Sequence, residues 1–332
     1  MMSSQNVIEI RELTKRYGDF VALDSLTIHL ERGQILGFIG PNGAGKTTTI
    51  KILVGLSRPT SGSAFVAGLD CTKDVHALKR VIGYMPDTFG SYDNMRVREY
   101  LDFFGAAFKI PRTQRQKRIE EVMEISGATY MKDRYVESLS HGMKQRVAIS
   151  RTLMHDPQVL ILDEPANGLD PQARIEMREL ILRLADMGKT LIVTSHILPE
   201  LARICNVVAM ITKGKLRAFG TLEEIMLKVR QRRMMEVQLV NPAQVDQAAD
   251  IIRPMEKEVS VSKAESMVRF STDAQDDKLS QILAALTRGN IAVVQFREQE
   301  LDLEDAFLSV TRAENNAAGQ GQPVAVGGRT HR

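Results

Sequence analysis

Cysteine is scarce in this chain of 332 residues. The two cysteines, Cys71 and Cys205, lie far apart and form no C-x-x-C pair. This usage argues against a disulfide framework or a zinc site and favours a reducing cytosol. The sequence also lacks any apolar run near the roughly 18 residues that a membrane-spanning helix needs. If the protein works at a membrane, we therefore expect a separate chain to do the spanning.

A strong charge bias is absent as well. The 44 Lys and Arg residues nearly balance the 41 Asp and Glu residues, which gives a net charge of +3. Nucleic-acid-binding proteins usually carry a larger basic excess, so no nucleic-acid partner is expected. Residues 1–9 contain no basic region followed by an apolar core, and we expect no signal peptide. The sequence shows neither an internal repeat nor a heptad run.

A glycine-rich loop at residues 40–48, GPNGAGKTT, is the most informative feature present. It fits G-x-x-x-x-G-K-[ST], in which backbone N–H groups cradle phosphates, a lysine reaches the β- and γ-phosphates, and a hydroxyl ligates Mg²⁺. Residues 34–39 predict a buried strand and residues 49–56 a helix, whose positive end adds to the amides. A glycine-rich turn with a solvated lysine is the alternative, which this strand–loop–helix order disfavours. The expected phosphate-binding residues are Gly40, Pro41, Asn42, Gly43, Ala44, Gly45, Lys46, Thr47 and Thr48.

Residues 7–220 alternate strand-like and helix-like patterns. Residues 159–162 and 191–193 are continuous apolar runs, which are typical of strands buried on both faces. Between them, Asp170 suits the N-cap of a helix and Gly188 its end. Strand, helix and strand in this order indicate a parallel sheet and an α/β core.

The composition also indicates the domain organisation. The first domain is expected at residues 1–227, with a helical insertion at about 89–150 where apolar residues recur at helical spacing. Residues 228–312 predict elements in the order β-α-β-β-α-β, the split βαβ arrangement of a small α+β domain. A short closing helix is expected at residues 303–311. The Gly-, Gln- and Ala-rich residues 313–332 predict a disordered tail.

Two adjacent carboxylates follow the buried strand at residues 159–162. Because successive strand residues point to opposite faces, Asp163 and Glu164 can take different roles. One can hold Mg²⁺, and the other can act as general base on the attacking water. The alternative is a strand that ends in solvent at a polar turn, which the upstream phosphate loop disfavours.

Further motifs occur in a characteristic order after the phosphate loop. Residues 139–146 (LSHGMKQR), 166–170 (ANGLD) and 194–196 (TSH) resemble, in turn, the signature, the D-loop and the switch histidine of ATP-binding cassette (ABC) ATPases. Tyr17, in KRYG, resembles the aromatic residue that stacks on adenine. The match covers about residues 7–220. The chain thus resembles the nucleotide-binding subunit of an ABC transporter.

The resemblance implies a P-loop NTPase fold with a mixed-sheet core and a helical subdomain, and it implies ATP and Mg²⁺ as cofactors. The implied catalytic residues are Lys46, Glu164 and His196. The implied metal site consists of Thr47, Asp163 and Asp87. Outside the phosphate loop, the implied nucleotide-binding residues are Tyr17, Ser140, Gly142 and Gln145.

Several of these roles have a physical basis and a plainer alternative. Ser140 can cap the helix that begins near Met143, whose positive end would face the γ-phosphate bound by the other subunit. An ordinary capped surface helix has the same pattern. His196 can donate a hydrogen bond to the γ-phosphate, or it can be a satisfied polar residue at a strand end. Tyr17 can stack on adenine or pack at a turn.

Two positions depart from the family pattern. Asp87 stands where the family usually has a Mg²⁺-sensing glutamine, so it adds negative charge beside the triphosphate. His141 stands where the signature usually has its first glycine, and Met143 and Lys144 precede Gln145. Such forms resemble the ATPases of type-2 ABC exporters, and we interpret them as a mark of that subfamily.

The leading prediction is an ATPase that powers an ABC transporter, with export the expected direction. The expected partners are a separately encoded membrane-spanning permease, contacted near residues 89–108, and a second ATP-binding subunit, most simply another copy. The expected location is the cytoplasmic face of the cell membrane. The alternative is a soluble ABC ATPase acting on nucleic acid or the ribosome, although the long coiled coil or second cassette of such proteins is missing. Glu164 and His196 argue against a nonhydrolytic regulator, and the C-terminal domain is expected to be a stabilising appendage without a ligand.

Overall fold

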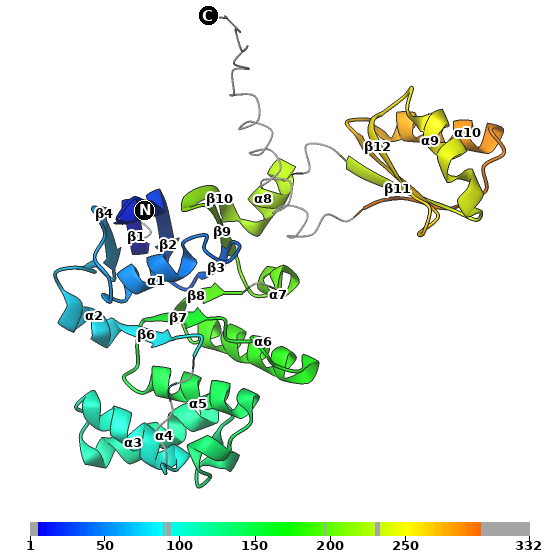
Figure 1. The fold of residues 1–332 in the computed structure, drawn as a ribbon. Helices are drawn as coiled ribbons and strands as arrows, with labels where there is room; N and C mark the ends of the chain where they lie inside the picture. The colour runs from blue at the N-terminus through cyan, green and yellow to red at the C-terminus, as the bar shows by residue number, and fades with distance from the viewer. Residues whose placement is uncertain (1–5, 89, 91–93, 196, 230–232, 300–332) are drawn as a thin grey trace, which may run out of the picture. The chain divides into compact units, whose positions relative to one another are not determined.

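The computed structural model describes residues 6–88, 90, 94–195, 197–229 and 233–299. The chain divides into two compact units, Met1–Leu222 and Glu223–Arg332. Figure 1 shows the order of the elements along the chain. Within the described residues, no helix combines the length and the apolar character that a membrane span requires.

A six-stranded sheet forms the centre of the first unit, with the strand order β10-β9-β3-β8-β7-β6. Neighbouring strands from β9 to β6 run parallel, whereas β10 pairs with β9 antiparallel, so the sheet is mixed as predicted. Every residue of β3, β7, β8 and β9 is buried, which confirms the two strands predicted from apolar runs. The strands are β3 Ile35–Ile39, β6 Ile82–Met85, β7 Val159–Asp163, β8 Thr190–Thr194, β9 Val207–Thr212 and β10 Lys215–Thr221.

A second, antiparallel sheet packs beside the first in the same unit. Its strand order is β2-β1-β4-β5, and the strands are β1 Asn6–Tyr17, β2 Phe20–Glu31, β4 Ser61–Val66 and β5 Leu69–Asp70. One hydrophobic cluster joins Ile28 of this sheet, Phe38 of the central sheet and Ile50 of helix α1, Lys46–Leu53. Helix α1 therefore lies between the two sheets, in line with Figure 1. The helix begins at Lys46, three residues before the predicted start, because the glycine loop passes directly into it.

Helices surround the far edge of the central sheet. Helices α3 Val97–Ala107, α4 Arg112–Ile125 and α5 His141–Leu153 pack on one another, and α5 also contacts β6. Helix α6, Pro171–Asp186, begins as predicted, because Asp170 accepts a hydrogen bond from the backbone N–H of Ala173 at 2.9 Å. The remaining elements of this unit are α2 Val75–Val81, α7 Leu198–Ala202 and the 3₁₀ turns η1 Thr129–Met131 and η2 Val136–Ser138.

The second unit contains a four-stranded antiparallel sheet in the order β12-β13-β11-β14. From Arg233 onward its elements confirm the predicted β-α-β-β-α-β order, and the helices Val245–Ile252 and Asp276–Arg288 share a hydrophobic core with Val237 and Phe270 of the sheet. On β11 the buried Glu236 accepts hydrogen bonds from Arg269 and Arg297. The elements are α8 Leu222–Val229, β11 Arg233–Leu239, η3 Pro242–Gln244, α9 Val245–Ile252, β12 Lys257–Ser262, β13 Met267–Thr272, α10 Asp276–Arg288 and β14 Val293–Glu298.

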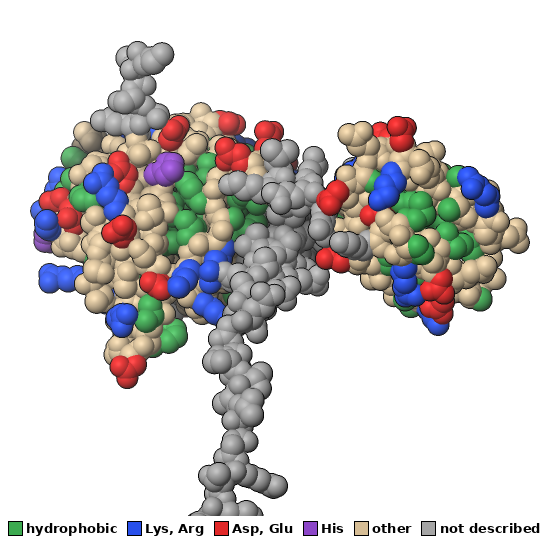
Figure 2. Space-filling model, turned by 90° about the horizontal axis from the view of Figure 1, so that it is seen from above, with side chains coloured by type: hydrophobic (Ala, Val, Ile, Leu, Met, Phe, Trp, Pro, Cys, Tyr) green, Lys and Arg blue, Asp and Glu red, His purple; other side chains and the backbone are tan. Residues whose placement is uncertain are grey.

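Two predictions for the C-terminal end fall on residues outside the described part of the chain, namely the closing helix at 303–311 and the tail at 313–332. On the face shown in Figure 2, basic and acidic side chains are interspersed on each unit. This mixture agrees with the small net charge of +3.

Candidate functional site

The glycine loop connects the buried end of β3 to the start of α1. Gly45 is the N-cap of α1 and has a φ of 114°, a conformation that L side chains rarely adopt. A Cβ atom on Gly45 would lie 2.6 Å from Leu23 Cδ2, and one on Gly40 would overlap the carbonyl oxygen of Ile211. Both positions therefore require glycine for close backbone packing, and the first turn of α1 keeps its unpaired N–H groups facing the loop.

Lys46 is the first residue of α1, and its side chain folds back over the loop. Its Nζ donates to the carbonyl oxygen of Gly40 at 2.5 Å and to that of Pro41 at 3.3 Å. Burial lowers the pKa of Lys46, and the negative charges of Glu164 and Asp163 oppose that shift. The lysine from one strand–helix junction and the carboxylates from another thus act on each other electrostatically. Thr47 follows with an exposed side chain in the first helical turn.

Asp163 is the last residue of β7 and is buried. Its Oδ1 accepts a hydrogen bond from Thr194 Oγ1 at 2.6 Å, and Thr194 ends the neighbouring parallel strand β8. Burial raises the pKa of Asp163; the Thr194 hydrogen bond and Lys46 oppose this, whereas Glu164 and Asp87 reinforce it. Three carboxylates therefore share one electrostatic environment, which a divalent cation would stabilise.

Glu164 does not continue the strand, which corrects one step of the sequence argument. Its φ is 52°, in the left-handed region, so the backbone leaves β7 at this residue. Its N–H donates to Thr194 Oγ1 at 2.9 Å. The two carboxylates are separated by this turn, and not by the alternation of side chains along a strand. A residue in this conformation is unusual outside glycine and recurs at functional sites.

Asp87 follows β6, at the same end of the sheet as the other carboxylates. Its Oδ1 accepts a hydrogen bond from Asn167 Nδ2 at 3.4 Å. Burial, reinforced by the charges of Asp163 and Asp87, raises the pKa of Tyr84 to about 12. The charge of Asp87 therefore reaches the carboxylate cluster, although its own side chain is exposed.

The signature residues lie at the start of α5. Ser140 is the N-cap and accepts from the backbone N–H of Met143 at 3.5 Å, which confirms the predicted cap, while the helix itself begins at His141. His141 Nε2 lies 2.8 Å from the carbonyl oxygen of Asn167 in the D-loop, residues 166–170. The signature and the D-loop are therefore in direct contact.

The structure places the remaining predicted residues as follows. Gln145 is buried, and its Nε2 lies 3.3 Å from His141 Nε2, so it packs beneath the signature. Gly142 packs near Leu169 of the D-loop. Tyr17 ends β1 with half of its surface exposed, and Lys15 Nζ is 4.9 Å from its ring centroid. His196 lies outside the described residues.

Sequence reasoning missed two residues that the structure connects to the site. Thr194 binds Asp163 and the backbone of Glu164, and Asn167 contacts both His141 and Asp87. A hydroxyl at the end of an apolar run was a usable signal for Thr194. The adjacency of β7 and β8, which gives that hydroxyl its partner, was not readable from the local sequence.

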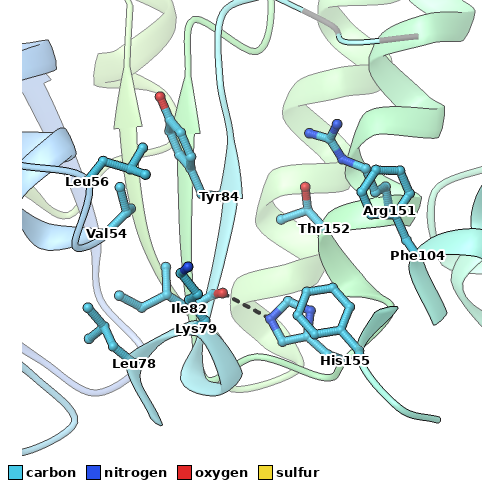
Figure 3. Close-up of a pocket in the computed structure, with 11 residues that line it drawn as sticks. Val54, Leu56, Leu78, Lys79, Ile82, Tyr84, Phe104, Arg151, Thr152 and His155 are labelled. Carbon is cyan, nitrogen blue, oxygen red and sulfur yellow. Dashed lines mark hydrogen bonds between the residues drawn. The ribbon is translucent and has the colours of Figure 1, made fainter. Parts of the chain in front are cut away.

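An apolar groove lies between the central sheet and the helices α3 and α5. Its volume is about 270 Å³. Figure 3 shows Leu56 and Ile82 on one side and Phe104 on the other. His155 closes one end, since it stacks on Phe108 with ring centroids 3.9 Å apart and contacts the carbonyl oxygen of Ile82 at 2.9 Å. Other residues that line the groove are Val54, Leu78, Lys79, Tyr84, Arg151 and Thr152.

Comparisons with known proteins assign this arrangement to a family. The family model described as ABC transporter matches residues 23–167. The chain is 38% identical over 313 residues to the bacitracin transport ATP-binding protein BcrA of Bacillus licheniformis, which covers 92% of this chain and 97% of that protein. It is 38% identical over 221 residues to the probable multidrug ABC transporter ATP-binding protein YbhF of Escherichia coli (strain K12). That match covers 67% of this chain and only 38% of the length of YbhF.

A solved structure gives the same answer. An ATP-binding subunit of an ABC transporter superposes with a TM-score of 0.61 at 28% identity, over 67% of this chain and 92% of that chain. The relatives are named as transporter proteins, so a soluble ATPase acting on nucleic acid or the ribosome is not favoured. The chain belongs to the ABC transporter ATP-binding proteins, a family of ATPases coupled to transport.

Proposed function

We propose that this chain binds ATP in the glycine loop and hydrolyses it to power a transporter whose membrane-spanning part is a separate chain. The observation that carries the proposal is the convergence of Lys46, Asp163 and Glu164, which come from two strand ends that are distant in sequence. Their mutual electrostatic influence supports a single site. Exposed N–H groups, a lysine and a general base are the parts that phosphoanhydride hydrolysis requires.

The residues of the loop fit a triphosphate and its metal. Glycine at positions 40 and 45 lets the loop pack closely on Ile211 and Leu23 and so keep its shape, and Lys46 can exchange its carbonyl partners for the β- and γ-phosphates. Thr47, Asp163 and Asp87 offer the oxygen ligands that Mg²⁺ prefers, and the ion would offset the charge of the phosphates. Thr194 keeps Asp163 oriented toward this role.

Glu164 is the proposed general base. Its backbone N–H is held by Thr194, and its carboxylate would orient and deprotonate the attacking water. His196 is proposed to donate a hydrogen bond to the γ-phosphate, and Tyr17 to stack on adenine. Ser140, Gly142 and Gln145 belong to the signature, which would meet the ATP of a second subunit through the positive end of α5.

The apolar groove is the proposed docking site for the membrane-spanning partner. An adjoining cavity of about 550 Å³ shares Phe108 and His155 with the groove. Two carboxylates in its lining, Glu121 and Asp156, pair with Arg118, and Arg80, Lys109 and Lys117 also line it. These cations complement an acidic side chain. We therefore propose that the partner inserts a segment with apolar residues and one carboxylate. The relatives BcrA and YbhF are named for bacitracin transport and for multidrug transport, and we propose a drug of this kind as the transported substrate.

Turnover of ATP by the purified protein tests this proposal. We expect phosphate release that depends on Mg²⁺, and loss of nucleotide binding in Lys46→Ala. The matched control is Lys51→Ala, which changes a lysine on the exposed side of the same helix and should leave turnover unchanged. Full activity in Lys46→Ala, or no turnover in the wild type with a transport-competent partner present, would contradict the assignment.

A further inference from the structure

Asn167 of the D-loop contacts three functional segments through three different groups. Its backbone N–H donates to the carbonyl oxygen of Glu164 at 3.1 Å. Its side-chain Nδ2 donates to Asp87 Oδ1 at 3.4 Å. Its carbonyl oxygen lies 2.8 Å from His141 Nε2. One residue thus joins the proposed general base, a proposed metal ligand and the signature.

The contact with His141 has a defined direction. A carbonyl oxygen can only accept, so Nε2 of His141 is the donor in this contact, and the Gln145 amide 3.3 Å from the same nitrogen does not donate to it. The imidazole also packs closely on Gly168: a Cβ there would lie 3.4 Å from both Cδ2 and Nε2 of His141. Gly168 has a φ of 70°, so glycine suits both the turn and the ring. The start of α5 and the D-loop are therefore linked by both a hydrogen bond and a close ring contact.

The D-loop in turn holds the residues of the subunit's own site. Glu164 is fixed on one side by Thr194 through its N–H and on the other by Asn167 through its carbonyl oxygen. Asp87, which follows a different strand, is tied to the same Asn167 side chain. A displacement of the D-loop therefore reaches Glu164 and Asp87 together.

We propose that His141 and Asn167 are positioning residues, which transmit engagement of the signature to Glu164 and Asp87 of the same subunit. This inference rests on the proposed function, in which the signature meets the ATP of the second subunit. When that ATP binds and displaces the start of α5, the D-loop moves with α5 because His141 joins them. Glu164 and Asp87 then shift relative to the subunit's own ATP. Occupancy of one site thereby sets the rate at the other. A glycine in place of His141 could not make this link.

A matched pair of variants tests the hydrogen bond itself. His141→Phe keeps a flat ring on Gly168 but removes the donor, whereas His141→Gln keeps a donor within reach of Asn167. In His141→Phe we expect kcat for ATP to fall about tenfold, the size of one lost hydrogen bond, with KM changed less than about twofold. The Hill coefficient for ATP should fall towards 1. In His141→Gln, kcat should recover to within about twofold of the wild type.

Asn167→Ala provides the second arm, because it removes the bond to Asp87 and leaves the backbone contacts. We expect kcat to fall about threefold, and the double variant with His141→Phe to lose less than the product of the two single effects, since both act on one link. If His141→Phe does not fold, Asn167→Ala with Asp87→Asn forms the corresponding cycle, and strictly multiplicative losses there would overturn the proposal.

Other results would also overturn it. These are wild-type kcat in His141→Phe, equal losses in the Phe and Gln variants, or a raised KM with unchanged kcat, which would indicate a role in ATP binding alone. Absence of ATP turnover in the wild type is a different result, because it would refute the proposed function itself.

Discussion

Thr194 Oγ1 donates a 2.6 Å hydrogen bond to Asp163 Oδ1. The same oxygen accepts the N–H of Glu164 at 2.9 Å, so one buried hydroxyl fixes the two carboxylate residues relative to each other. Thr194 and Asp163 end adjacent parallel strands, and their pairing depends on the sheet order. The uncharged side chain of Thr194 thus orients both the proposed metal ligand and the proposed general base.

Thr194→Val keeps the shape of the side chain and removes the hydroxyl. We expect the free energy of unfolding to fall by about 2–4 kcal/mol, because the buried Asp163 and the N–H of Glu164 both lose a partner. ATP turnover should fall at least about tenfold. Thr194→Ser, which retains the hydroxyl, is the control and should stay near the wild type in turnover. Urea denaturation and phosphate release measure the two effects, and an active, stable Val variant would show that the hydroxyl is dispensable.

Substitutions at two glycines of the loop can distinguish backbone strain from side-chain crowding. Gly43 and Gly45 both have positive φ, but a Cβ on Gly43 meets nothing within 4 Å, whereas one on Gly45 meets Leu23 Cδ2 at 2.6 Å. Gly43→Ala should lower stability by about 1–2 kcal/mol through conformation alone. Gly45→Ala should lower the free energy of unfolding by about 1–3 kcal/mol more, because the added methyl group overpacks the site. It should also lose ATP binding. Chemical denaturation measures both, and equal losses would contradict the crowding argument.

Glu164→Gln removes the proposed base and keeps the shape of the side chain. We expect ATP to bind without turnover and to hold two subunits together. Size-exclusion chromatography with ATP should then show a dimer. Adding Lys46→Ala to the variant should return it to a monomer, because nucleotide binding is lost. A Glu164→Gln protein that stays monomeric at saturating ATP would count against the two-subunit arrangement.

Leu56→Asp places a charge on the rim of the apolar groove. Leu56 is 63% exposed, so the change should alter stability by no more than about 0.5 kcal/mol. We expect at least about a fivefold loss of the protein recovered with membranes of the cell that encodes it. The control is Met187→Asp, at another exposed apolar residue of the same unit, 47% exposed. Equal recovery of the two variants would mean that the groove does not receive the partner.

His155 should make stability depend on pH. Burial lowers its pKa below the usual 6.5, and the hydrogen bond to Ile82 only partly opposes this. The unfolded chain therefore takes up a proton at higher pH than the folded protein does. Stability should be full above pH 6.5 and decline as pH falls through the window between 6.5 and the lowered pKa. The test is the difference in unfolding free energy between about pH 7.5 and about pH 5.5. This difference should shrink by about the His155 contribution in His155→Gln, whose side chain can still donate to Ile82. An unchanged difference would exclude His155 as its source.

Much of the fold could be predicted because its signals are local. Apolar runs indicated β7 and β8, Asp170 indicated the start of α6, and successive strand-like and helix-like segments indicated the β-α-β-β-α-β order of the second unit. These features depend on residues that are neighbours in sequence. The same is true of the glycine loop, whose composition almost determines its conformation.

The parts that could not be predicted depend on pairing between distant segments. The contact of His141 with Asn167 spans 26 residues, and that of Asn167 with Asp87 spans 80. The left-handed φ of Glu164 has no composition cue, because glutamate does not favour that region. Such features arise from the order of strands in the sheet, which brings loops together only after the strands have paired.

Lys46 already has two carbonyl partners, Gly40 and Pro41, within its own loop. Under the proposed function, an incoming phosphate group would replace those oxygens and would not have to immobilise a mobile side chain. Folding has already met the entropic cost of fixing the lysine rotamer, which is up to about 1.5–2 kcal/mol. The proposed nucleotide site is therefore preorganised. Substitutions that loosen the loop should weaken nucleotide affinity even where they touch no phosphate.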